Sequence, residues 1–93
     1  MVRDIEKTLI EHPDVAEVCV VSVSKNGHGK ESRAFVVLHE GAQTSAESLL
    51  AFCNEQVPQA EQPKGIHVLE ALPKGRMGIV SRRALVELAL NSA

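Results

Sequence analysis

Aromatic side chains are almost missing from this chain of 93 residues, which has two Phe and neither Trp nor Tyr. Proteins that bind single-stranded nucleic acid usually stack the bases on such rings, so the composition argues against that class. The formal net charge of −2 also provides no general attraction to polyanions. The sequence therefore predicts a protein that does not bind nucleic acid.

Long apolar runs are missing as well. No stretch approaches the ~20 consecutive apolar residues that a membrane-spanning helix needs. The first residues do not show the basic and apolar pattern of a signal peptide. These two observations predict a cytoplasmic protein without a membrane segment.

Cysteines and histidines are few, and they are not grouped. Cys19 and Cys53 are far apart and each lies in an apolar run, which is typical of buried free thiols and not of a disulfide. Paired ligand spacings are missing, so no metal site is expected. The four histidines are scattered singly and are expected at the surface or at edges of the fold, namely His12, His28, His39 and His67.

The length and the overall composition of the chain are those of one small globular domain. Hydrophobic residues make up 44% of the chain and charged residues 24%, which is ordinary for a soluble protein. A chain of this size can enclose one modest core but not a deep active-site cleft of its own. Residues 1–93 are therefore expected to form a single domain.

Hydrophobic spacing predicts alternating helices and strands. The expected helices are 4–11, 45–57 and a C-terminal helix that begins at Ser81, and the expected strands are 15–23, 33–39 and 66–69. The polar turn 24–30 predicts that the second strand is antiparallel to the first. The order α-β-β-α-β-α predicts an α+β fold in which helices flank a small sheet of about three strands.

Two helix starts carry local signals. Thr44, with Glu47 three residues later, has the spacing of a capping box. Ser81 is expected to cap the last helix, because no neighbouring base is indicated that would make it a nucleophile. Leu85, Leu88 and Ala89 are expected to form the apolar stripe of that helix.

The segment from Leu72 to Arg83, here called the glycine loop, is locally basic. It contains no acidic residue, and Gly75 and Gly78 would let backbone amides approach an anion. One interpretation is a loop that recognises phosphate or a partner, and the other is a solvated basic turn. The candidate binding residues are Lys74, Arg76, Gly78, Arg82 and Arg83.

The run Leu72-Pro73-Lys74, followed by a glycine and the pair Arg82-Arg83, resembles the closing motif of the adenylate-forming enzymes. This family includes the acyl-CoA synthetases (AMP-dependent synthetases and ligases) and the adenylation domains of peptide synthetases. Further segments resemble the family in order and spacing, including His12-Pro13, the strand 34–38, Gly41 and Pro63. The resemblance covers nearly the whole chain and identifies it as similar to the family's C-terminal domain, the lid.

Several positions depart from the family's pattern. Ser24-Lys25 replaces a usual Pro-Asp, Lys30 replaces a glutamate, and Glu61 replaces a lysine. The chain also begins at the first helix of this domain. The resemblance therefore implies a lid whose hinge and large N-terminal ATP- and acyl-binding domain are absent from this chain.

The most consequential departure is Ile79, which stands where the family has its catalytic lysine. In the family, that lysine contacts the substrate carboxylate and the phosphate oxygens while the acyl-adenylate forms. Isoleucine has neither a charge nor a hydrogen-bond donor, and loss of one such donor typically costs ~2.7–4 kcal/mol, about 10²–10³ in rate. The resemblance thus implies no catalytic residue in this chain.

Two functions follow from the resemblance. The first is a lid that acts with a separate N-terminal adenylation domain in acyl-adenylate or thioester formation, with ATP and Mg²⁺, and CoA or pantetheine, bound only when that partner is present. The alternative is a catalytically dead interaction module that binds an adenylating enzyme or a carrier protein. Exposed core edges would also permit a homodimer. In either case the chain alone is not expected to be an enzyme.

Overall fold

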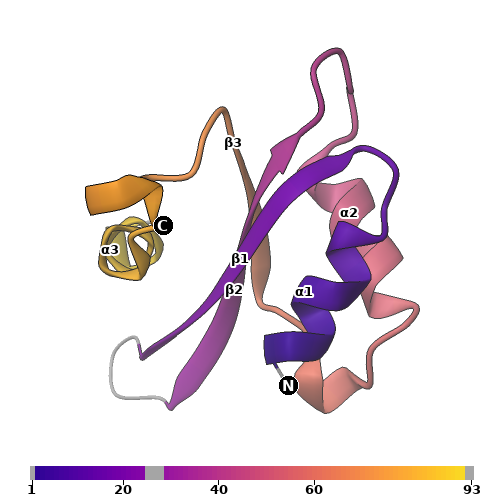
Figure 1. Cartoon of the computed structure of the whole chain (residues 1–93). Coiled ribbons are helices and arrows are strands. Elements are labelled where there is room, and N and C mark those ends of the chain that lie inside the picture. Colours follow the sequence, from indigo (N-terminus) through magenta and orange to yellow (C-terminus); the bar gives the residue numbers. More distant parts are fainter. Residues whose placement is uncertain (1, 25–28, 92–93) are drawn as a thin grey trace.

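The computed structural model describes residues 2–24 and 29–91. Within these residues, a sheet of three strands is flanked by three α-helices and two short 3-10 turns (Figure 1). In chain order the elements are α1 (Val2–Ile10), β1 (Val15–Ser24), β2 (Lys30–Leu38), α2 (Ala46–Asn54), η1 (Gln59–Glu61), β3 (Gly65–Leu69), η2 (Arg76–Gly78) and α3 (Arg82–Asn91). The predicted α+β class and the order α-β-β-α-β-α are confirmed.

The sheet has the strand order β1-β2-β3, so β2 is central. β1 pairs antiparallel with β2, as the sequence predicts, and β3 pairs parallel with β2. Antiparallel strands can be joined by a tight turn, whereas the parallel pair needs a crossover. That crossover is the segment that contains α2.

Helices cover both faces of the sheet. α1 and α2 pack on one face and α3 on the other (Figure 1). This explains why β1 is rich in valine on both sides: the adjacent residues Val20 and Val21 are both buried, and they belong to different cores. The first core contains Ile5, Leu9, Val15, Val20, Ala34, Val36, Leu49, Cys53, Val57 and Ile66. The second contains Cys19, Val21, Val23, Phe35, Leu72, Leu85 and Ala89.

Two local expectations are corrected. The cap of α2 is Ser45, whose side chain accepts a hydrogen bond of 3.1 Å from the amide of Ser48. Thr44 does not form the predicted capping box, because its hydroxyl donates to the carboxylate of Asp14 instead. In α3, Leu85 and Ala89 are buried but Leu88 is 47% exposed. The buried pair has the i, i+4 spacing of one helical face, and Leu88 lies at its margin.

Among the described residues the two cysteines are as expected, whereas two of the three histidines are partly buried. Cys19 and Cys53 are buried free thiols. His12 and His67 are partly buried, and each ring contacts a phenylalanine ring at a centroid distance of 4.8 Å. His39 is exposed, and His28 lies outside the described residues, as does Lys25.

Neither a metal-binding cluster nor a membrane-spanning helix occurs in the described residues. No group of three or more metal-binding side chains occurs in 2–24 and 29–91. Within these ranges no helix combines the length and the apolar character needed to cross a membrane.

Candidate functional site

The glycine loop leaves β3 and returns to α3 as a short hairpin. Lys74 and Val80 form an antiparallel bridge at its base. The amide of Gly75 donates to the Ile79 carbonyl over 2.7 Å, and the amide of Ser81 donates to the Pro73 carbonyl over 2.8 Å. These bonds hold the two arms of the loop together.

The tip of the loop is the 3-10 turn η2, which runs from Arg76 to Gly78. Met77 and Gly78 both have positive φ angles, 61° and 74°. Such angles are easy for glycine and unusual for methionine. The side chains of Met77 and Ile79 are 95% and 68% exposed, so the tip presents two apolar groups to solvent.

Of the predicted binding residues, Lys74 and Arg82 are already engaged. Lys74 forms an ion pair of 3.3 Å with Glu17, and both side chains are more than 40% exposed. An exposed pair of this kind contributes little stability and can open easily. Arg82 donates over 2.8 Å to the backbone carbonyl of Val20 and lies 3.8 Å from the carboxylate of Glu6.

The other predicted residues lie at the surface. The side chains of Arg76 and Arg83 are exposed and form no hydrogen bond or ion pair with any residue in the described ranges. Gly78 lies at the tip with a positive φ, where an added side chain would be strained. The fold therefore brings Arg76 and Gly78 to one tip and directs Arg82 toward β1. The five candidates do not converge on one anion site.

Two acidic residues beside the loop were not predicted from the sequence to belong to this site. Glu17 on β1 and Glu6 on α1 contact Lys74 and Arg82. No local spacing signals these contacts, because the partners of the first pair are 57 residues apart. Glu6 and Glu17 leave the loop less strongly basic in three dimensions than in sequence.

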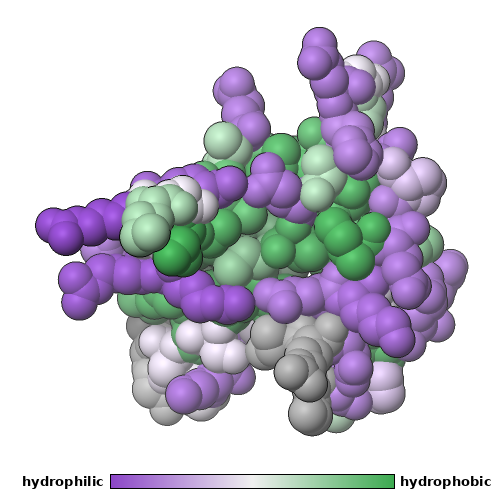
Figure 2. All heavy atoms as spheres, viewed as in Figure 1, coloured by the Kyte–Doolittle hydropathy of each residue, from purple (hydrophilic) through white to green (hydrophobic). Residues whose placement is uncertain are grey.

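Apolar surface lies beside the loop. A groove of about 520 Å³ between α1 and the loop is lined by Glu6, Lys7, Ile10, Glu17, Val18, Leu72 and Val80. On the face of the molecule that contains this groove, Figure 2 shows apolar surface in the middle and polar side chains around it. A second apolar groove, of about 540 Å³, is lined by Leu69, Ala71, Leu72, Pro73, Ala84, Glu87, Leu88 and Asn91. Open apolar grooves of this kind suit contact with another protein surface.

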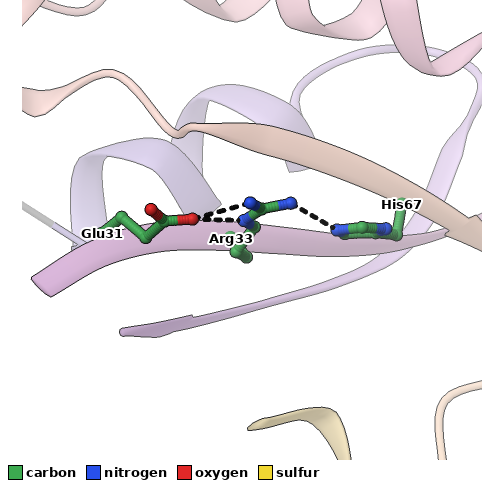
Figure 3. A network of polar contacts seen from close by, with 3 residues as sticks. All are labelled: Glu31, Arg33 and His67. Atoms are coloured by element: carbon green, nitrogen blue, oxygen red, sulfur yellow. Dashed lines mark hydrogen bonds and ion pairs between the residues drawn. The ribbon is translucent and has the colours of Figure 1, made fainter. Parts of the chain in front are cut away.

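A third concave region is polar and lies away from the loop. It has a volume of about 540 Å³ and is lined by residues 30–32 and 59–64. Beside it, Arg33 contacts Glu31 at 2.7 Å and the His67 ring at 3.4 Å (Figure 3). The guanidinium lies across Gly65, where an added Cβ would be 3.2 Å from its nitrogen. Because its charge is already paired with Glu31, this network stabilises the β2–β3 pair and does not offer a free cation.

The sequence of this chain is similar to those of known proteins. The family described as "AMP-binding enzyme C-terminal domain" matches residues 4–78. The chain is 35% identical to a long-chain-fatty-acid–CoA ligase of Bacillus subtilis, over 91% of this chain and 15% of the ligase. It is also 35% identical to an acetyl-coenzyme A synthetase of Deinococcus radiodurans, over 92% of this chain and 13% of the synthetase. The chain thus spans about one seventh of the length of these relatives.

Solved structures give the same result. ATP-bound MatB from Rhodopseudomonas palustris superposes with a TM-score of 0.86 and 27% identity, over 96% of this chain and 18% of that protein. A benzoate CoA ligase from Burkholderia xenovorans superposes with a TM-score of 0.78 and 33% identity, over 91% of this chain and 18% of the ligase. In both, the similarity is confined to a fraction of a larger protein.

Proposed function

Because this chain belongs to the AMP-binding enzyme C-terminal domain family, we propose that it is the lid of an acyl-CoA-synthetase-type ligase and works with an N-terminal adenylation domain. The observation that carries the proposal is the glycine loop, a hydrogen-bonded hairpin whose tip residues Met77 and Ile79 are exposed. An exposed loop tip can enter an active site that another domain builds. The reaction proposed for the complete assembly is formation of an acyl-adenylate or a thioester in the cytoplasm.

The partner domain, and not this chain, is proposed to hold ATP and Mg²⁺. Arg82 is directed toward the Val20 carbonyl and Glu6, and Lys74 is paired with Glu17, so the lid alone does not gather these cations into one site for a triphosphate. When bound by the partner, ATP supplies the phosphate that activates the carboxylate. The residues left for contact from the lid are Arg76 and Arg83, together with the backbone at Gly78.

Ile79 determines which step the lid can assist. Its side chain is 68% exposed at the end of the tip, and it brings no charge to a carboxylate or phosphate. We therefore propose that the chain contributes little to adenylate formation. Its contribution would fall in thioester formation with CoA or pantetheine, which in the family does not depend on the lysine.

The second candidate is an interaction module without catalytic function. The exposed Met77 and Ile79 and the two apolar grooves favour it, because such surfaces bind proteins better than they bind phosphate. Its partner would be an adenylating enzyme or a carrier protein. A homodimer through the same surface is the remaining arrangement, and sedimentation of the chain alone would detect it.

A complementation experiment tests the proposal. The chain is mixed with an adenylation domain that lacks its own lid, and ATP–pyrophosphate exchange and thioester formation are measured separately. The lid proposal predicts increased thioester formation with the natural chain. It also predicts that Ile79→Lys raises the exchange rate by about 10²–10³, because a preorganised cation is restored.

The control is Val68→Lys, which adds the same charge on β3 at a position that is 40% exposed and outside the loop. It should leave the exchange rate unchanged. If neither the natural chain nor Ile79→Lys raises either activity while binding to the adenylation domain persists, the interaction module replaces the lid. If there is no binding, both candidates fail.

A further inference from the structure

β1 forms one edge of the sheet, and the middle of that edge is closed by two side chains. The outward amide of Val20 donates to Glu6 Oε2 over 2.9 Å. The outward carbonyl of the same residue accepts from Arg82 Nη1 over 2.8 Å. Both backbone groups that a neighbouring strand would use at this position are therefore occupied.

The two side chains come from opposite faces of the sheet. Glu6 lies on α1, which packs on the same face as α2, and Arg82 is the first residue of α3 on the other face (Figure 1). Arg82 Nη2 and Glu6 Oε2 lie 3.8 Å apart across the strand edge. One strand residue thus connects the two helical layers.

The same arginine lies at the base of the glycine loop. It follows Ser81, whose amide donates to the Pro73 carbonyl and whose hydroxyl accepts from the amide of Ala84 at the start of α3. The contact between Arg82 and the Val20 carbonyl therefore links β1 to the point where the loop enters α3.

We infer that Glu6, Val20 and Arg82 form an edge clamp that closes β1 and positions the glycine loop on the domain. Arg82 is then a positioning residue that acts through the backbone of β1, and not a phosphate ligand. The clamp also prevents another strand from pairing with β1, since unpaired strand edges attract other chains.

The polarity of the clamp is set by the strand. The N–H of Val20 needs an acceptor and its C=O needs a donor. Glutamate at position 6 and arginine at position 82 satisfy both, whereas the reverse arrangement would satisfy neither. This distinguishes the edge clamp from a simple ion pair, which would work equally well with the two charges exchanged.

Hydrogen exchange at the Val20 amide tests the clamp directly. In Glu6→Met the amide loses its acceptor, and its exchange should become at least tenfold faster relative to the amide of Val36 in the central strand. The ratio to Val36 corrects for any general loss of stability. Arg83→Met is the control, because it removes a neighbouring exposed arginine that does not contact β1. Unchanged relative exchange in Glu6→Met would overturn the clamp.

Exchanging the charges tests its polarity. The double variant Glu6→Arg/Arg82→Glu keeps an opposite-charge pair but puts a donor against the N–H and an acceptor against the C=O. We expect Val20 exchange to stay as fast as in Glu6→Met and the Tm to stay below that of the natural chain. Full recovery of both quantities would show a simple ion pair and overturn the inference.

A functional measurement, which rests on the proposed lid function, tests the positioning role. At saturating concentrations of the chain, Arg82→Met should lower thioester formation about tenfold. Arg82→Lys, which keeps a donor, should retain most of the rate. Equal loss in both variants, with exchange at Val20 unaffected, would overturn the positioning role. If the natural chain shows no complementation, the lid proposal fails, and the exchange measurements still decide the clamp.

Discussion

Met77 holds a backbone conformation that few side chains adopt. Among the described residues it is the only non-glycine with a positive φ, at 61°, and its side chain is 95% exposed. Such a conformation costs of order 1–3 kcal/mol in a non-glycine residue. Because Met77 is almost fully exposed, no packing of its side chain offsets this cost, and the tip of the glycine loop is strained.

Met77→Gly should relieve that strain. Glycine adopts the left-handed region freely but loses more chain entropy on folding, so the net gain in the free energy of unfolding should be about 0.5–1 kcal/mol. Chemical denaturation measures it. Met77→Ala is the matched control, because it removes the long side chain and keeps the strain. An equal gain in both variants would attribute the effect to loss of the exposed side chain.

The two buried thiols make the stability of the protein depend on pH in the alkaline range. Burial raises the pKa of Cys53 above its ordinary value of 9.0. Burial also raises the pKa of Cys19, against a lowering by Arg82 and with a further rise from Glu6. Both thiols should therefore stay protonated in the folded state at a pH where the unfolded chain has begun to lose its thiol protons.

Stability should consequently fall as the pH rises above 9.0. The thiol contribution is fully present below that value and is lost between it and the raised folded pKa, because there the unfolded state binds fewer protons. The slope is at most about 1.4 kcal/mol per pH unit for each thiol. The chain has no Tyr that would titrate nearby. Denaturation at several pH values gives the slope of the free energy of unfolding against pH. This slope should be shallower in Cys53→Ala, and the contribution of the thiols should vanish in the double variant Cys19→Ala/Cys53→Ala. An unchanged slope in the double variant would refute this assignment.

At the scale of elements, the start of α2 shows how neighbouring polar residues divide their roles. Ser45 has the extended backbone of a cap, with φ −93° and ψ 162°, and accepts from the Ser48 amide. Thr44, one residue earlier, joins the loop before α2 to Asp14, the residue that precedes β1. The helix start and the tertiary contact therefore use two adjacent hydroxyl groups.

Ser45→Ala should destabilise the protein by about 1 kcal/mol, within the range of 0.5–2 kcal/mol known for helix caps. The reason is that the Ser48 amide would lose its partner. Thermal or chemical denaturation measures the change. Ser48→Ala, in the exposed first turn of the same helix, is the control and should change stability by less than about 0.5 kcal/mol. Comparable losses in both variants would contradict the capping role of Ser45.

At the scale of the whole molecule, the sheet separates two cores. Ile5 belongs to the core under α1 and α2, and Leu85 belongs to the core under α3. Each core packs on its own face of the sheet, so the two sets of side chains do not fill a common space. The edge clamp of Glu6, Val20 and Arg82 is where polar groups from both helical layers meet.

Substitutions in the two cores should therefore add. Ile5→Val should cost about 0.5–1.5 kcal/mol and Leu85→Ala about 2–5 kcal/mol, because each leaves a cavity in a buried site. The double variant should equal the sum within about 0.5 kcal/mol, as expected for distant sites. Urea denaturation of the three variants provides the test. A coupling energy above 1 kcal/mol would show that the sheet transmits packing changes between the cores.

The sequence by itself determined the class and order of the elements and the family. Alternating and periodic apolar residues specify strands and helices through local geometry, and four of the five valines of β1 are buried because both faces of that strand are covered. The local backbone preference of Ser81 likewise places a cap at α3, whose Ala84 amide donates to the Ser81 hydroxyl. These properties depend on neighbours along the chain, and a sequence displays them.

Only the tertiary structure decided which charges meet and which groups remain available. Arg82 and Val20 are 62 residues apart, and Lys74 and Glu17 are 57 apart. Their contacts exist because the sheet and its two helical layers bring distant segments together. Hydrogen-bond partners at such separations follow from packing and chain closure, and no local pattern encodes them. The basic loop that the sequence displays is for this reason partly neutralised, and Arg82 is directed toward the strand edge.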